Sequence, residues 1–137
     1  MSVNLLNMKI LMVDDDLYNM RPTIDALEVR GAIVEIARTG TDALEILSKK
    51  IFDLVILDIM LTSGKGIETD DQGRSTGIIV YKRIRQGKLL KLPIVVSTVV
   101  SDPEYLLIFE RDKKCKIINK PYTFKDILFA IDYVMNS

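Results

Sequence analysis

Several residues that can do chemistry stand directly after short apolar runs of this sequence. They are Asp14, Asp15, Asp16, Asp58, Ser97, Thr98 and Lys120. Three consecutive aspartates follow one run, a single aspartate closes another, two hydroxyl residues close a third, and a lysine–proline pair follows a fourth. If these runs are parallel strands of one sheet, all of these side chains meet at its carboxyl edge, where ligands bind in such folds.

This set of residues predicts a site that receives a phosphoryl group. Carboxylates that converge on one point repel each other unless a cation is present. Oxygen ligands suit a hard divalent ion, and Mg²⁺ takes one or two carboxylates together with phosphate oxygens. A carboxylate can then act as the nucleophile, while a hydroxyl group and an ammonium group bind the incoming phosphoryl oxygens.

Each residue also has a simpler structural explanation. An aspartate after a strand often caps the next helix, and we favour that explanation for Asp16. The two aspartates before it could be solvated turn residues, Thr98 a strand threonine and Lys120 a surface lysine. Asp58 differs because apolar residues flank it on both sides, so burying it without a role would be costly. The functional interpretation depends on the joint placement of the whole set.

The apolar runs have the lengths expected of strands in a doubly wound α/β sandwich. They are Ile10–Val13, Ile33–Ala37, Leu54–Leu57, Ile94–Ser97 and Ile117–Ile118. The third and fourth runs are continuously apolar, which is typical of strands that helices cover on both faces. Amphipathic segments follow the runs, so we predict a five-stranded parallel sheet with helices on both faces.

The ends of the predicted helices are marked to different degrees. The apolar stripe of the first helix consists of Leu17, Met20, Ile24 and Leu27. Gly31 follows as a stop signal, and Pro22 falls early enough that we expect an irregular first turn or a late start. A fourth helix at about Pro103–Arg111 has the weakest pattern, whereas Thr123 and Asp126 form the capping box of the last helix.

The composition fits one domain of ordinary size. The chain has 137 residues, 48% of them hydrophobic and 28% charged, with a formal net charge of zero. Balanced charge argues against nucleic acid or a membrane surface as a partner. One cysteine and no histidine exclude an internal disulfide and a zinc cluster. There is no signal-peptide pattern and no apolar run long enough to span a membrane, so we expect a cytoplasmic protein.

One segment interrupts the alternation of strands and helices. We predict a single domain over residues 1–137 with an inserted loop at about 63–76, which is polar and rich in glycine. Connections in such folds usually take about 2–6 residues. A solvated insertion and a flap that docks a partner or shields the site are both open interpretations.

Four motifs together resemble the receiver domain of response regulators from about residue 9 to residue 135. Ile10–Asp16 resembles the first strand with its acidic pair, and Asp53–Leu61 resembles the strand that carries the phosphoacceptor. Pro93–Thr98 is similar to the fourth strand with its hydroxyl, and Asn119–Pro121 to the lysine–proline turn. Each motif alone is weak, but all four in order make a specific match. The resemblance implies a flavodoxin-like, stand-alone receiver of two-component or phosphorelay signalling, similar to chemotaxis receivers.

The resemblance also implies a role for each reactive residue. Asp58 would be the phosphoacceptor, and Thr98 and Lys120 would bind the phosphoryl oxygens. The implied ligands of Mg²⁺ are Asp14, Asp15, Asp58 and the backbone carbonyl of Met60. The Lys120–Pro121 peptide bond is expected to be cis.

A receiver of this kind is a signalling module rather than an enzyme, because it catalyses only its own phosphorylation and dephosphorylation. The implied partners are a sensor histidine kinase or histidine phosphotransfer protein and an unidentified downstream protein. No output domain follows the last helix, so we expect signalling by contact. The expected contact surface, on the fourth helix, fifth strand and last helix, offers Tyr105, Leu107, Phe109, Lys116 and Tyr122.

Some positions depart from the family pattern. Ile117 replaces the usual aromatic switch, Val99 replaces the small residue after the hydroxyl, and Thr62 replaces a proline after the phosphoacceptor. Two further positions usually orient the water that hydrolyses the aspartyl phosphate, and here they are Met60 and Val100. Neither side chain can orient water, so we expect a long-lived phosphorylated form.

Two alternative functions stay open. A haloacid-dehalogenase-type phosphatase would use Asp14 as its nucleophile, but it needs a later acidic pair that is missing after the fourth strand. Turnover of a phosphomonoester would identify such an enzyme. A degenerate receiver that acts only as a docking module is suggested by Ile117, although the intact set of reactive residues argues against it.

Overall fold

Five short strands form one parallel sheet in the computed structural model, which describes residues 3–60, 76–87, 89–99 and 103–137. The strands are β1 (Lys9–Val13), β2 (Ile33–Ala37), β3 (Leu54–Asp58), β4 (Ile94–Thr98) and β5 (Cys115–Asn119). Their order across the sheet is β2-β1-β3-β4-β5, the order of flavodoxin-like sheets. The predicted fold class is therefore confirmed.

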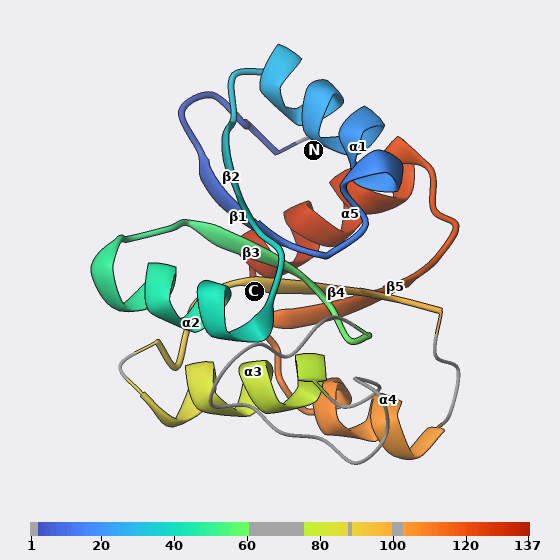
Figure 1. Ribbon diagram of the computed structural model, residues 1–137. Coiled ribbons are helices and arrows are strands. Elements are labelled where there is room, and N and C mark those ends of the chain that lie inside the picture. The colour runs from blue at the N-terminus through green and yellow to red at the C-terminus, as the bar shows by residue number, and fades with distance from the viewer. Residues whose placement is uncertain (1–2, 61–75, 88, 100–102) are drawn as a thin grey trace.

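Helices cover both faces of this sheet (Figure 1). They are α1 (Leu17–Val29), α2 (Gly40–Lys49), α3 (Thr76–Gln86), α4 (Pro103–Glu110) and α5 (Phe124–Met135). Helices α1 and α5 lie on one face, and α2, α3 and α4 lie on the other. Within the described ranges, no helix is both long and apolar enough to cross a membrane.

The strands supply alternate residues to two hydrophobic cores. In β1, Ile10 and Met12 pack against α1 and α5, whereas Leu11 and Val13 pack against the helices of the other face. All residues of β3 and β4 are buried, as their continuous apolar runs predict. Burying one such aliphatic side chain contributes about 1.5–3 kcal/mol. The cores therefore fix the strands, and with them the polar residues at the strand ends.

Helix α1 ends just before Gly31, the predicted stop signal, and Pro22 does not delay the start of the helix. The helix begins at Leu17, directly after the N-cap residue Asp16, and Pro22 lies inside it. Gly31 has a φ of +96° and closes a Schellman motif, in which its N–H donates to the carbonyl of Glu28. The late start that we expected from the proline does not occur.

Other boundaries differ slightly from the predicted ones. Strand β5 begins at Cys115, before the run that we identified, and α4 ends one residue early at Glu110. The capping box of α5 is confirmed, because the side chains of Thr123 and Asp126 each accept the other's backbone N–H. Thr76, the last residue of the predicted loop, belongs to α3, and residues 63–75 lie outside the described part of the chain.

Candidate functional site

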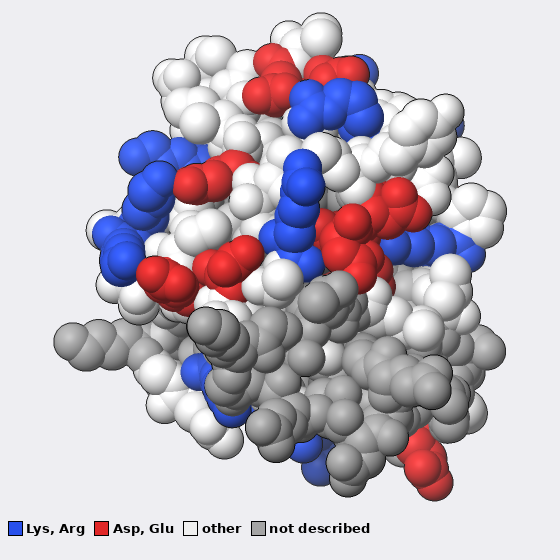
Figure 2. Space-filling view, in the orientation of Figure 1, with Lys and Arg blue, Asp and Glu red and all other residues white. Residues whose placement is uncertain are grey.

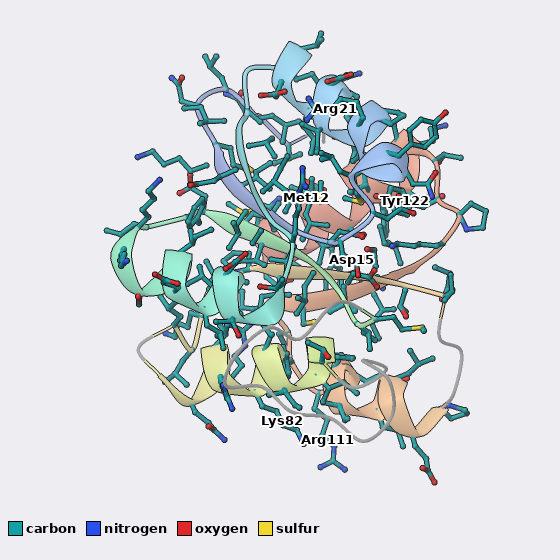
Figure 3. The ribbon with its side chains drawn as sticks, in the orientation of Figure 1. Met12, Asp15, Arg21, Lys82, Arg111 and Tyr122 are labelled. Carbon is teal, nitrogen blue, oxygen red and sulfur yellow. The ribbon has the colours of Figure 1, made fainter. Side chains whose placement is uncertain are left out.

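The ends of β1 and β3 bring three of the predicted carboxylates together. Ligand oxygens of Asp14, Asp15 and Asp58 lie within 4.8 Å of one another. The first and third of these residues are buried, and Asp15 is exposed. Acidic atoms gather near the middle of the face that Figure 2 shows, and Figure 3 shows Asp15 just beyond the end of β1.

Lys120 reaches this acidic cluster from the turn between β5 and α5. Its Nζ atom lies 2.8 Å from Oδ2 of Asp14 and 3.1 Å from Oδ2 of Asp58. Its backbone N–H donates to the carbonyl of Thr98 at 2.9 Å, so the turn is fixed to the end of β4. The Lys120–Pro121 peptide bond is cis, as expected.

The second oxygen of each buried carboxylate accepts a backbone hydrogen bond. Oδ1 of Asp14 accepts from the N–H of Asp16 at 2.9 Å. Oδ1 of Asp58 accepts from the N–H of Met60 at 3.1 Å. Each carboxylate is thus held between the Lys120 ammonium and a backbone donor, which fixes its orientation at the edge of the sheet.

Burial and neighbouring charges shift the pKa values of Asp58 and Lys120. Burial raises the pKa of Asp58 to about 6, the Lys120 charge lowers it, and the neighbouring Asp14 raises it again. Burial by itself would lower the pKa of Lys120, but its contacts with both aspartates raise it. The pKa of Asp58 is thus raised mainly by burial, and the pKa of Lys120 is raised by its two carboxylate partners.

The cluster is compatible with a bound divalent cation. Its ligand atoms are carboxylate oxygens, the donor type that hard ions such as Mg²⁺ prefer. Three carboxylates with one ammonium nearby leave an excess of negative charge that a divalent ion would neutralise. The geometry and the charge therefore both fit Mg²⁺.

The remaining reactive residues occupy two different positions. Thr98 is buried at the end of β4, one residue beyond Ser97, which pairs in register with Asp58. Asp16 instead caps α1, because its carboxylate accepts the backbone N–H of Asn19 at 3.2 Å. The interpretation of Asp16 as a helix cap is therefore confirmed.

Three of the positions that depart from the family pattern belong to the described residues, whereas Thr62 lies outside them. Val99 is 63% exposed, and Met60, whose backbone N–H donates to Asp58, is 37% exposed. Ile117 is partly buried and packs against the core below α2, α3 and α4. Val100 lies outside the described residues.

The predicted contact surface needs correction. Phe109 is only 1% exposed, because its ring packs edge-on against Tyr81 in the core. Tyr122 lies beside α1 (Figure 3), where its hydroxyl is 3.4 Å from Oγ1 of Thr23. Leu107 is exposed and Lys116 is partly exposed, whereas the side chain of Tyr105 lies outside the described part.

Two further aromatic residues that we did not predict lie on α5, which belongs to this surface. Phe129 and Tyr133 of α5 are 67% and 42% exposed. The ammonium of Lys116, from β5, lies 4.8 Å from the centroid of the Tyr133 ring. The helical pattern contained the signal, since both aromatic residues fall outside the buried stripe of α5, which is Ile127, Ala130, Ile131 and Val134.

A hollow of about 620 Å³ adjoins Lys120 on the side of α1. It is lined by Asp16, Asn19, Met20, Pro22, Thr23, Val99, Lys120, Pro121 and Tyr122. The lining combines apolar and polar side chains, and Lys120 connects it to the acidic cluster. A bulky group could therefore approach the cluster from this side.

Comparison with known sequences identifies a family. The model of the response regulator receiver domain matches residues 10–132. Response regulator MprA of Mycobacterium leprae is 39% identical over 70 residues, which make up 51% of this chain and 31% of MprA. MprA of Mycobacterium ulcerans is 36% identical over 72 residues, or 53% of this chain and 31% of that protein. The matches thus span about a third of these relatives' length.

Comparison with solved structures agrees on the fold. The chemotaxis response regulator CheY4 of Vibrio cholerae superimposes with a TM-score of 0.74 and 25% identity, covering 93% of this chain and 98% of that one. A response regulator receiver domain protein of Methanospirillum hungatei gives a TM-score of 0.76 at 24% identity, covering 95% and 94% of the two chains.

Proposed function

Because this chain belongs to the response regulator receiver domain family and serves two-component signalling, we propose that Asp58 is its phosphoacceptor. Phosphorylation there, with Mg²⁺ bound, would switch the contacts of the domain with a downstream protein. The observation that carries the proposal is a buried carboxylate with a raised pKa, held between Lys120 and the backbone N–H of Met60.

In the proposed reaction, a carboxylate oxygen of Asp58 bonds to phosphorus while the bond from phosphorus to the donor's imidazole nitrogen breaks. The electron pair of that bond stays on the nitrogen. The Lys120 ammonium and the Thr98 hydroxyl would bind the phosphoryl oxygens as the phosphoryl group moves onto Asp58. Asp14, Asp15, Asp58 and the carbonyl of Met60 would hold Mg²⁺, which when bound neutralises negative charge on the phosphoryl group.

The proposed phosphodonor is a sensor histidine kinase or a histidine phosphotransfer protein. Its phosphohistidine must reach a buried carboxylate, so the donor must contact the rim of the site. The hollow beside Lys120 offers apolar contact area there, including Val99 and Tyr122. The downstream target is a protein that we do not identify, and neither nucleic acid nor membrane is part of the proposal.

Under this proposal, residues 1–137 form a single receiver domain that works in the cytoplasm. The domain is a signalling module that catalyses only its own phosphorylation and dephosphorylation. The alternative of a dehalogenase-type phosphatase would need Asp14 as the nucleophile. It would also need a later acidic pair, whereas β4 ends in Ser97 and Thr98 and is followed by Val99.

Two neighbouring aspartates provide a matched test of the metal site. Asp15→Asn removes a ligand of the cluster, so phosphorylation by phosphoramidate should need more Mg²⁺ and proceed more slowly. Asp16→Asn keeps a capping side chain outside the cluster and should retain wild-type kinetics. Equal Mg²⁺ dependence in the wild type and in Asp15→Asn would contradict the proposed ligand set.

A further inference from the structure

Helix α3 approaches the end of β3 so closely that only glycine fits at position 77. A Cβ atom on Gly77 would lie 2.3 Å from the Cα atom of Ile59 and 2.4 Å from the carbonyl oxygen of Asp58. Both neighbours are backbone atoms and cannot rotate away as a side chain would. By contrast, a Cβ atom on Gly87, just after the same helix, would meet nothing closer than 3.7 Å.

This close approach places Gly77 one peptide group away from the Asp58 carboxylate. The N–H of Gly77 donates to the carbonyl of Ile59 at 2.8 Å. The N–H of Met60 donates to Oδ1 of Asp58 at 3.1 Å. The carbonyl of Ile59 and the N–H of Met60 belong to the same planar peptide group, so tilting one end tilts the other.

We propose that Gly77 is a positioning residue, which lets α3 hold the Ile59–Met60 peptide group so that its N–H fixes the Asp58 carboxylate. Any side chain at position 77 must push α3 or the Asp58–Ile59 backbone aside. The peptide group then loses its orientation, and Oδ1 of Asp58 loses its backbone donor. The consequence for phosphoryl transfer rests on the proposed function, whereas the hydrogen-bonded link does not.

The experiment compares Gly77→Ala with Gly87→Ala in the complete chain. Without divalent cation, nuclear magnetic resonance measures hydrogen exchange of the Met60 amide relative to amides of β1 and β4. With Mg²⁺ and phosphoramidate, the rate of Asp58 phosphorylation is followed. We expect Gly77→Ala to speed exchange at Met60 at least about tenfold and to slow phosphorylation about 10–100-fold, since small misplacements of reacting groups have such effects. Gly87→Ala should match the wild type in both.

A folded Gly77→Ala protein with wild-type exchange at Met60 and a wild-type phosphorylation rate would overturn the proposal. If that variant does not fold, an amide-to-ester substitution at Met60 removes the same donor and leaves Gly77 intact. It should slow phosphorylation to a similar extent, and a wild-type rate would overturn the proposal. Absence of phosphorylation in the wild type would instead refute the proposed function, while the exchange result would still test the link to Asp58.

Discussion

Two clusters of aspartate with a basic residue lie at opposite ends of the sheet, and their partners differ. At the carboxyl end, Lys120 is shared by Asp14 and Asp58. At the amino end, Asp112 accepts hydrogen bonds from the Tyr81 hydroxyl at 2.6 Å and from Nε of Arg85 at 2.7 Å. We call the second cluster the Asp112 bracket, because it joins α3 to the segment between α4 and β5.

The Asp112 bracket satisfies the groups that it buries. Its other carboxylate oxygen accepts the N–H of Lys114, and the guanidinium of Arg85 also donates to the carbonyls of Leu89 and Lys114. Burial by itself would raise the pKa of Asp112, but the hydrogen bonds from Tyr81 and Arg85 lower it below its ordinary value. The pKa of Asp58 moves the other way, to about 6.

Similar residue types therefore serve opposite purposes. The bracket gives one carboxylate several donors, so its ionised form stabilises the fold. The site buries two carboxylates beside one ammonium, so its ionised form is costly until a cation binds. A buried carboxylate with a raised pKa indicates a candidate functional site, whereas a carboxylate whose hydrogen bonds lower its pKa indicates a structural role.

Removing Lys120 should produce the largest effect. Lys120→Ala leaves two buried carboxylates without their ammonium and removes a charge that would bind the phosphoryl oxygens. We expect phosphorylation by phosphoramidate to slow about 10²–10³-fold, the effect of losing one such group. Lys125→Ala, exposed on α5, is the matched control. If Lys120→Ala were phosphorylated at the wild-type rate, the Lys120 cluster would have no role in phosphoryl transfer, and the contrast with the Asp112 bracket would be wrong.

Breaking the Asp112 bracket should instead affect stability. Asp112→Ala leaves the Arg85 guanidinium and the Tyr81 hydroxyl without their acceptor, and should lower the free energy of unfolding by about 3 kcal/mol in urea titrations. The exposed pair of Arg21 and Asp25 supplies the control, because Asp25→Ala should cost less than about 0.5 kcal/mol. Slower phosphorylation of folded Asp112→Ala, with unchanged stability, would contradict a structural role.

Replacing Asp58 should raise the stability of the fold, whereas replacing Asp112 should lower it, because the pKa of Asp58 is raised. The folded protein binds this proton more tightly than the unfolded chain, so without divalent cation its stability should fall as the pH rises from about 4 to 6. Asp58→Asn removes the charge that forms in this range. The free energy of unfolding of the variant, measured relative to the wild type, should therefore be about 2 kcal/mol more favourable to the fold at pH 7.5 than at pH 4. Equal differences between variant and wild type at both pH values would contradict a raised pKa.

The smallest expected change concerns the apolar rim of the site. Met60 cannot orient the water that hydrolyses an aspartyl phosphate, so the phosphorylated domain should be long-lived. Met60→Asn should speed release of phosphate by about 10–100-fold, at or below the usual contribution of a positioned polar group. Met60→Leu keeps an apolar side chain at this position and should leave the rate of phosphate release unchanged. A wild-type half-life of seconds, measured as phosphate release, would refute this expectation.

The sequence contains most of the fold and the main members of the site. Continuous apolar runs identify β3 and β4 because both of their faces are buried. Strands that run parallel must end at the same edge, which explains why Asp14, Asp58 and Lys120 could be grouped before their distances were known. The capping pattern at Thr123 is likewise local and could be read directly.

The features that could not be predicted from the sequence depend on contacts between distant segments. The bracket joins Tyr81 to Asp112, and no local pattern marks such a pair. We expected Phe109 on the surface by analogy with the family, and because α4 is apolar around most of its circumference, its buried face could not be recognised from the sequence. Gly77 resembles any glycine near a helix start until the backbone of β3 is known to lie against it.

The central claim is that Asp58 accepts the phosphoryl group, and tandem mass spectrometry tests it most directly. The protein is incubated with phosphoramidate and Mg²⁺, the acyl phosphate is reduced with borohydride, and the modified residue is located. We expect one modification, at Asp58, that requires Mg²⁺, disappears in Asp58→Asn and persists in Asp53→Asn, where the exposed aspartate is changed. Modification of Asp58→Asn at the wild-type level, or modification of another aspartate in the wild type, would contradict the claim.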